Sequence, residues 1–439
     1  MKIVRVTNME WRDAFAIALA FLAAFTDAKI GPIQLAEFFT IAFATWHCAV
    51  FIASRATQLS PIAKQQLRSA AVFIGIAIVG AVIGVFGNNY FTPLAADSIL
   101  KKPAYVSLAR IIQIGLCTYS MTILLDRGEK SPNLLPRIQK SYIYGAITSV
   151  IYGGISWLSI KGGIDLGGTY ITNSGDLRMR GFFVEGGPFG LYIATALVLL
   201  INSKENYRKS GFIANIAILM LGLSLSKSKA AFIAILLPVI IATLLSPAYP
   251  IRNRLKIFLV ALVVVSTAFW LGDCYHRILG YFMAAQAVMA SPDSFADNGN
   301  VALGRIAGSF IVPNMVMAHP LFGVGIGNYS LVRNDPLYRD FLPYVEEWDL
   351  HGLGLIGATS EIGIIGVLFF SWWYLKPYLL TRKISPPLKQ SFFIFPLFAF
   401  VFGVQLTFVY PWIMFSIAML MSNRELTSHR ATVTPDPAT

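Results

Sequence analysis

The stretch from His319 to Phe370 organises the chain: HPLFGVGIGNYSLV at residues 319–332 and, after a polar linker, DLHGLGLIGATSEIGIIGVLFF at residues 349–370. Its second half predicts a membrane helix with His351 at its mouth, just outside the hydrocarbon. Glu361 lies ten residues further on, which is roughly 15 Å deeper at the helical rise, so the two side chains cannot form a hydrogen bond. A neutral, titratable imidazole at a membrane mouth is suited to act as a general base, although a histidine that only ends a helix has the same sequence context.

The composition is that of a membrane protein. Of the 439 residues, 56% are hydrophobic and 13% are charged, whereas about 25% of residues are charged in a soluble protein. Many apolar windows are long enough to cross a hydrocarbon core of about 30 Å. The net charge of +13 is explained by cytoplasmic anchoring rather than by nucleic acid. Neither a cleavable signal peptide nor a disulfide framework is evident.

We expect an all-α polytopic membrane protein with about twelve transmembrane helices. These spans are placed near residues 13–28, 32–53, 69–87, 104–125, 141–159, 188–202, 212–226, 229–245, 257–272, 351–373, 391–406 and 409–422. With both termini inside, most of the 35 basic residues fall on the cytoplasmic side. That distribution agrees with the positive-inside rule.

The chain then divides into four parts. Residues 1–272 hold spans one to nine, 273–350 form one large periplasmic loop domain, 351–422 hold the last three spans, and 423–439 form a disordered cytoplasmic tail. Within the loop domain, we expect a surface helix over 276–291 and an interfacial or re-entrant helix over 301–318, interrupted by Pro313. GVGIGN at 323–328 has no preceding strand, so it predicts a tight joint against a helix rather than a phosphate loop.

Several basic residues break the charge pattern because they lie in a span or on the outer side. They are Arg110 in the fourth span, Arg178 and Arg180 before the sixth, Lys227 and Lys229 in a turn between two spans, and Arg305 in the outer loop. A cation near the bilayer costs a few kcal/mol unless it is paired or faces a wet cavity. Snorkelling to lipid head groups explains any one of them alone. Together they predict an anionic ligand, and the planar fork of arginine suits phosphate.

No acidic pair suited to Mg²⁺ is visible in the sequence, and we expect no metal site. Glu346, Glu347 and Asp349 come directly before His351. Either such a run is simply solvated, or one carboxylate orients the imidazole.

The residues resemble a known family. HPLFGVGIGNYSLV followed by His351, Leu355, Glu361 and Gly363 looks like the signature of the O-antigen ligase and polymerase superfamily, which includes bacterial protein O-oligosaccharyltransferases. RMRGFFVEGGPFGLYIA at 178–194 and SLSKSKAAFIA at 224–234 are similar as well, so the resemblance covers roughly residues 170 to 370. Two departures stand out. Lys229 replaces the usual arginine, and glycine follows His351 where the family often has asparagine.

The resemblance, most of all to O-antigen ligases, implies a C-type glycosyltransferase-like fold. Such an enzyme moves a glycan from undecaprenyl pyrophosphate to the lipid A core at the periplasmic side of the bacterial inner membrane. The reaction is inverting and metal-independent and needs no cofactor. The implied residues are His351 as catalytic base, Arg180, Lys229 and Arg305 as pyrophosphate ligands with Arg178 and Lys227 beside them, and Glu347, Asp349 and Glu361 in support.

Other readings of the sequence stay open. An O-antigen polymerase or a protein O-oligosaccharyltransferase uses the same donor. A twelve-helix transporter is the first non-enzymatic alternative, although such transporters are often built of two related halves and none are visible here. A lipid-glycan flippase needs cations inside the spans, where only Arg110 lies deep.

Overall fold

The computed structural model describes residues 11–30, 33–54, 58–87, 102–171, 177–245, 302–340 and 353–433, together with isolated positions between them. Of the helices at 47–54 and 302–306 it describes the backbone alone. Most of the ninth expected span and most of the surface helix expected at 276–291 lie outside the described residues.

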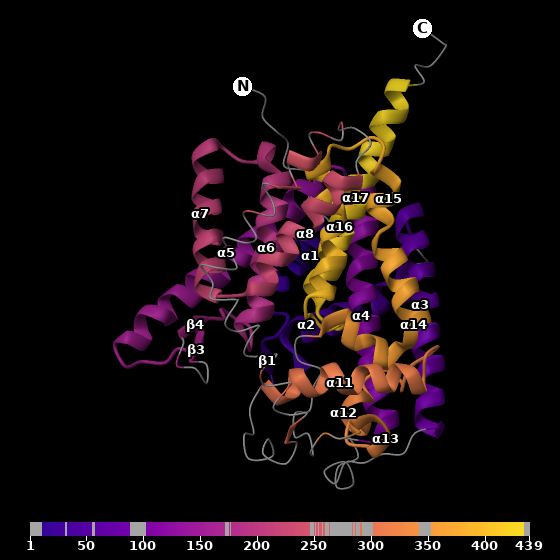
Figure 1. Cartoon of the computed structure of the whole chain (residues 1–439). Coiled ribbons are helices and arrows are strands. Elements are labelled where there is room, and N and C mark those ends of the chain that lie inside the picture. The colour runs from indigo at the N-terminus through magenta and orange to yellow at the C-terminus, as the bar shows by residue number, and fades with distance from the viewer. Residues whose placement is uncertain are drawn as a thin grey trace, which may run out of the picture.

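The described elements are nearly all helices (Figure 1). In chain order they are α1 (Trp11–Leu22), the 3-10 turn η1 (Ala23–Phe25), α2 (Leu35–Ser54), α3 (Pro61–Gly87), α4 (Pro103–Lys130), α5 (Leu134–Lys161), α6 (Gly186–Asn202), the 3-10 turn η4 (Lys204–Asn206), α7 (Lys209–Ser226), α8 (Lys229–Leu245), α11 (Ala302–Ala318), α12 (Tyr329–Val332), α13 (Pro336–Arg339), α14 (Gly354–Tyr374), α15 (Lys376–Thr381), α16 (Pro387–Val401) and α17 (Val409–Val433). Two antiparallel hairpins join β1 (Lys29–Ile30) to β2 (Ile33–Gln34) and β3 (Thr169–Ile171) to β4 (Leu177–Met179).

The protein is a helical membrane protein. Five of the described helices, α3, α4, α5, α7 and α14, are long and apolar enough to cross a membrane. On α3 the large apolar side chains of Val82 and Phe86 are 52% and 86% exposed, an outer surface that suits hydrocarbon rather than water. Several helices run past the apolar windows of the sequence; α5, for example, begins at Leu134 rather than near 141.

Polar contacts mark one end of the bundle. Asp13 on α1 accepts a hydrogen bond from Arg127 Nε near the end of α4 at 2.7 Å. Arg424 on α17 donates to the backbone oxygen of Pro132 at 2.7 Å, and Lys389 pairs with Glu425. The start of α1, the end of α4 and the polar part of α17 therefore lie at one end, which is rich in basic residues.

The opposite end, named here the loop end, holds β3, β4 and helices α11 to α13 (Figure 1). Asp27 Oδ2 accepts a hydrogen bond from the Val184 N–H at 2.8 Å. Ser107, at the start of α4, donates to the Ile326 carbonyl at 2.8 Å. Figure 1 shows α11 lying across the bundle at this end, as expected of an interfacial helix, with Pro313 inside it.

The aromatic core lies where α14, α16 and α17 meet. Trp373 and Trp412 are fully buried, with ring centroids 5.7 Å apart. Phe370 packs edge-on against Phe400 at 5.2 Å. The Trp373 indole N–H donates to Gln66 Oε1 at 2.8 Å, so α14 is fixed to α3 as well.

Helix α14 is broken at Gly363, which has φ 66° and ψ 179°. A neighbouring segment, residues 320–325, inserts into the break and is called the clasp here. Its backbone replaces the helical hydrogen bonds that the break removes, and within hydrocarbon such groups need partners. The bonds run from Ile364 N to Pro320 O (2.9 Å), Ile365 N to Leu321 O (3.3 Å), Val324 N to Ser360 O (2.7 Å) and Gly325 N to Glu361 O (3.1 Å).

Glycines make room for the clasp on both sides. Gly323 and Gly325 have φ values of 70° and 94°, a region that favours glycine. On α3, a Cβ added to Gly84 would lie 2.1 Å from the Val324 carbonyl oxygen. The tight joint predicted from GVGIGN is therefore confirmed.

The C-terminal tail differs from the sequence prediction. Helix α17 continues to Val433, so the prediction of disorder is wrong for residues 423–433. The segment NRELTSHR holds good helix formers and no proline, and it extends a helix that packing has already nucleated.

We predict that Gly363→Ala destabilises the protein by about 2 kcal/mol or more, because a left-handed conformation strains an alanine and its Cβ would lie 2.1 Å from Leu321 O. The apparent Tm in detergent, followed by tryptophan fluorescence, measures the loss. Gly75→Ala on α3 is the matched control, because a Cβ there meets nothing within 4 Å. Equal Tm values for the two variants would contradict the claim that the close contact between Gly363 and the clasp stabilises the protein.

Candidate functional site

Two basic segments of the sequence meet at the loop end. A Cβ on Gly186, at the start of α6, would lie 2.9 Å from Ser226 O and 3.1 Å from Met179 O. Ser228 Oγ donates to the Gly187 carbonyl at 3.1 Å. Strand β4, the start of α6 and the turn between α7 and α8 are therefore packed together. The four cations that these elements hold are called the basic corner here: Arg178, Arg180, Lys227 and Lys229.

Part of the Arg180 guanidinium is hydrogen-bonded to the backbone of neighbouring segments. Its Nε donates to Gly167 O at 2.8 Å and its Nη1 to Val184 O at 3.0 Å, and its guanidinium lies 6.0 Å from the centre of the Tyr170 ring. These bonds join the segments that precede and follow the β3–β4 hairpin. Arginine has five N–H donors, so the others remain for a ligand.

Unlike Arg180, Arg178 has a side-chain nitrogen that is buried without a hydrogen bond to the described residues. Arg178 faces Tyr170 across the hairpin register, and the buried nitrogen is its Nε. Such a donor costs about 1–3 kcal/mol unless a ligand or water supplies an acceptor. This nitrogen therefore points to an acceptor that comes from outside the described residues.

The two lysines flank a tight turn. Lys227 is exposed and has φ 51°, the left-handed conformation that ends α7. Lys229 is half-buried and begins α8. Helices α6 and α8 both start at the basic corner, so two helix N-termini with their partial positive charge add to the four cations.

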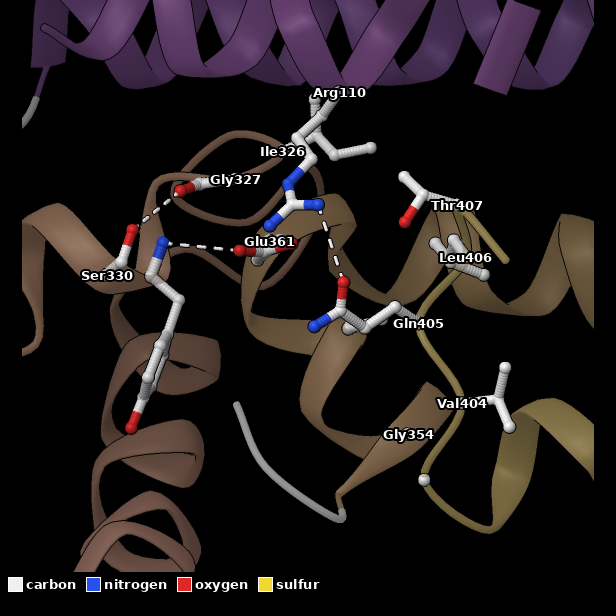
Figure 2. Close-up of a pocket in the computed structure, with 13 residues that line it drawn as sticks. Arg110, Ile326, Gly327, Ser330, Gly354, Glu361, Val404, Gln405, Leu406 and Thr407 are labelled. Atoms are coloured by element: carbon white, nitrogen blue, oxygen red, sulfur yellow. Dashed lines mark hydrogen bonds between the residues drawn. The ribbon is translucent and has the colours of Figure 1, made fainter. Parts of the chain in front are cut away.

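A cavity lies at the same end of the bundle, and Figure 2 shows its lining. Arg110 of α4 points toward Glu361 of α14 and Gln405, which lies in the joint between α16 and α17 (Figure 2). Arg110 Nη1 lies 3.4 Å from Gln405 Oε1, and Glu361 Oε1 accepts from the Tyr329 N–H at 3.3 Å. Together with Thr407, these side chains define what we call the Arg110 cavity, of about 70 Å³.

The joint between α16 and α17 connects the cavity to the basic corner. Residues 403–407 line the cavity. A few residues on, Tyr410 Oη donates to Pro188 O near the start of α6 at 3.5 Å, and its ring lies 6.1 Å from that of Phe183. One short segment therefore contacts both regions.

The expected site residues fall into three groups. The segments that carry Arg178, Arg180, Lys227 and Lys229 pack against one another, and Glu361 lies instead in the Arg110 cavity. His351, Glu347 and Asp349 lie outside the described residues, although Gly354, three positions after His351, lines the cavity. Arg305 belongs to α11, where the backbone alone is described.

Sequence reasoning missed most of the cavity. Arg110 stood out only as a charge inside a span, whereas Gln405 lay at the end of the eleventh expected span and Thr407 in the joint after it, and neither was singled out. The signal that could have found them is the polar pair Gln405 and Thr407 beside Gly403 and the aromatic residues of FVFGVQLTF at 400–408. Among the residues that the structure describes, no group of three or more His, Cys, Asp or Glu side chains is placed to hold a metal ion.

No family model matches this chain, and no curated protein matches it with significance. The class of protein that the fold defines is a helical membrane protein with an anion-suited corner and a mixed polar cavity at one end.

We predict that Arg180→Lys loosens the two ends of the β3–β4 hairpin, because a lysine has no planar fork with which to bind both carbonyl oxygens at once. Amide hydrogen exchange over residues 163–185 should rise about tenfold, since hydrogen bonds from a charged group contribute about 1.5–3 kcal/mol each. Arg208→Lys, an exposed change at the start of α7, is the control. Unchanged exchange would show that Arg180 does not hold the two ends of the hairpin together.

Proposed function

We propose that the protein is a glycosyltransferase of the bacterial inner membrane, an O-antigen ligase that moves a glycan from undecaprenyl pyrophosphate to the lipid A core. The proposal includes twelve spans, a C-type glycosyltransferase-like fold, both termini in the cytoplasm and the loop end on the periplasmic side. Helices α1 to α8, α14, α16 and α17 overlap the spans expected from the sequence, which supports this arrangement. So does the basic character of the opposite end.

The basic corner is the observation that carries the proposal. Four cations and two helix N-termini gather at one place, and the buried Arg178 Nε has no partner among the described residues. A dianionic or trianionic ligand best satisfies such a set. The pyrophosphate of a lipid-linked glycan brings this charge to the outer rim of a membrane protein.

In the proposed reaction, the acceptor hydroxyl oxygen attacks the anomeric carbon of the glycan as the bond from that carbon to the phosphate oxygen breaks. The pyrophosphate leaves with the electron pair, and His351 takes the hydroxyl proton, a step typically worth roughly 10²–10⁴-fold. Arg180, Lys229 and Arg305 stabilise the leaving oxygen, with Arg178 and Lys227 beside them. Each preorganised donor is worth about 3–4 kcal/mol, by comparison with single oxyanion donors.

Ligase, polymerase and protein transferase share this donor, so the acceptor distinguishes them. Purified protein is given one lipid-linked glycan and three acceptors: lipid A core, a second lipid-linked glycan, and a pilin-like peptide. We expect transfer to the lipid A core. Transfer to either of the others alone would replace the ligase with that alternative.

We predict that His351→Ala abolishes glycan transfer while the protein stays folded and membrane-inserted, because the acceptor hydroxyl loses its base. Initial rates and the apparent Tm measure the two effects. Near-normal transfer by the variant would remove this histidine from the mechanism.

We predict that Arg178→Met weakens inhibition of transfer by inorganic pyrophosphate about tenfold or more, because one charge-assisted contact contributes about 1.5–3 kcal/mol. Its Tm should not fall, since the buried Nε without a partner is removed. Arg339→Met is the matched control, because Arg339 Nε in α13 is also buried and lacks a partner among the described residues. Equal inhibition constants for the two variants would argue against the basic corner as the pyrophosphate site.

A further inference from the structure

The Arg110 cavity carries a balanced set of charges. Arg110 supplies a guanidinium, Glu361 a carboxylate and Gln405 an amide, and all three converge on one space (Figure 2). They come from α4, from the break in α14 and from the joint before α17. The basic corner, in contrast, is defined by four cations, and the one carboxylate of the segment 177–187 is Glu185 at the start of α6.

Thr407 gives independent evidence for a ligand. The residue is only 3% exposed and lines the cavity, yet its Oγ1 has no hydrogen-bond partner among the described residues. Figure 2 shows this oxygen directed toward Arg110 and Gln405. Buried hydroxyl groups normally have a hydrogen-bond partner. The Thr407 hydroxyl is therefore available for a hydrogen bond with a ligand in the cavity.

The charges decide the class of ligand. A phosphate in this cavity would meet the Glu361 carboxylate, and a cation would meet the Arg110 guanidinium. A sugar hydroxyl donates one hydrogen bond and accepts two, so it can serve the carboxylate, the guanidinium and Thr407 together. The apolar side chains of Ala358 and Leu406, also in the lining, suit the C–H face of a sugar ring. We infer that the Arg110 cavity binds hydroxyl groups of a neutral sugar.

The size and position of the cavity refine this assignment. Its volume of about 70 Å³ exceeds several times the roughly 10–15 Å³ that one water needs, so it holds the edge of one ring while the rest of the glycan projects through the open mouth. Gly354 lines the cavity three residues after His351. On the proposed function, which this step rests on, the bound sugar is therefore the acceptor's.

The test uses Thr407→Val in the purified full-length protein, with neutral methyl hexosides as probes and saturation-transfer NMR as the readout. Loss of one hydrogen bond should weaken hexoside binding roughly fivefold, and the KM for the glycan acceptor should rise while that for the donor stays constant. Thr118→Val is the matched control. Thr118 is 4% exposed, its hydroxyl also lacks a partner among the described residues, and it lies on α4 outside the cavity lining.

The outcomes separate this site from the proposed function. Hexoside binding that Thr407→Val weakens and Thr118→Val leaves intact supports the sugar site, even if no acceptor is ever glycosylated. Absent hexoside binding, equal binding by both variants, or displacement of the hexoside by inorganic pyrophosphate overturns it. Active transfer with an acceptor KM unchanged in Thr407→Val overturns the acceptor assignment and leaves the ligase proposal standing.

Discussion

Four backbone hydrogen bonds between the clasp and the broken helix α14 are the constraint on which the rest of this end of the molecule depends. They join residues 320–325 to residues 360–365. Each unpaired peptide group in hydrocarbon costs several kcal/mol, so neither the break nor the clasp is stable without the other. A helix interrupted inside a membrane is tolerated here because another segment of the same chain completes its ladder.

The break also decides where functional side chains lie. Glu361 lies two residues before it. Its carbonyl oxygen accepts a hydrogen bond from the clasp, and its carboxylate accepts one from the Tyr329 N–H, a few residues beyond the clasp. If α14 were a continuous helix, no other backbone segment would approach the Glu361 carboxylate in this way. The break lets the chain of residues 326–330 approach the side of α14, and the space left between them and the α16–α17 joint is the Arg110 cavity.

The sequence predicted the parts whose causes are local. Apolar length predicted the helices, the cluster of glycines at 323–327 predicted a close approach of two segments, and Pro313 predicted a helix that does not cross. The break at Gly363 was not predicted, because a single glycine in an apolar run reads as a helical residue and its partner lies some forty positions earlier in the chain. Arg110 was recognised as an unusual charge inside a span. Gln405 and Thr407 become part of a site only because the fold places α4, α14 and the α16–α17 joint around one cavity.

The separation of the two regions follows from their charges. If Glu361 lay in the basic corner, it would neutralise part of the positive potential that an anion needs. If the four cations lay in the Arg110 cavity, a neutral hydroxyl could not compete with phosphate for them. The fold keeps Glu361 on α14, apart from the corner on β4 and the starts of α6 and α8, and residues 403–410 contact both regions. A reaction that must hold a charged leaving group beside an uncharged nucleophile requires that division, because the same environment cannot favour an anion and a neutral alcohol equally.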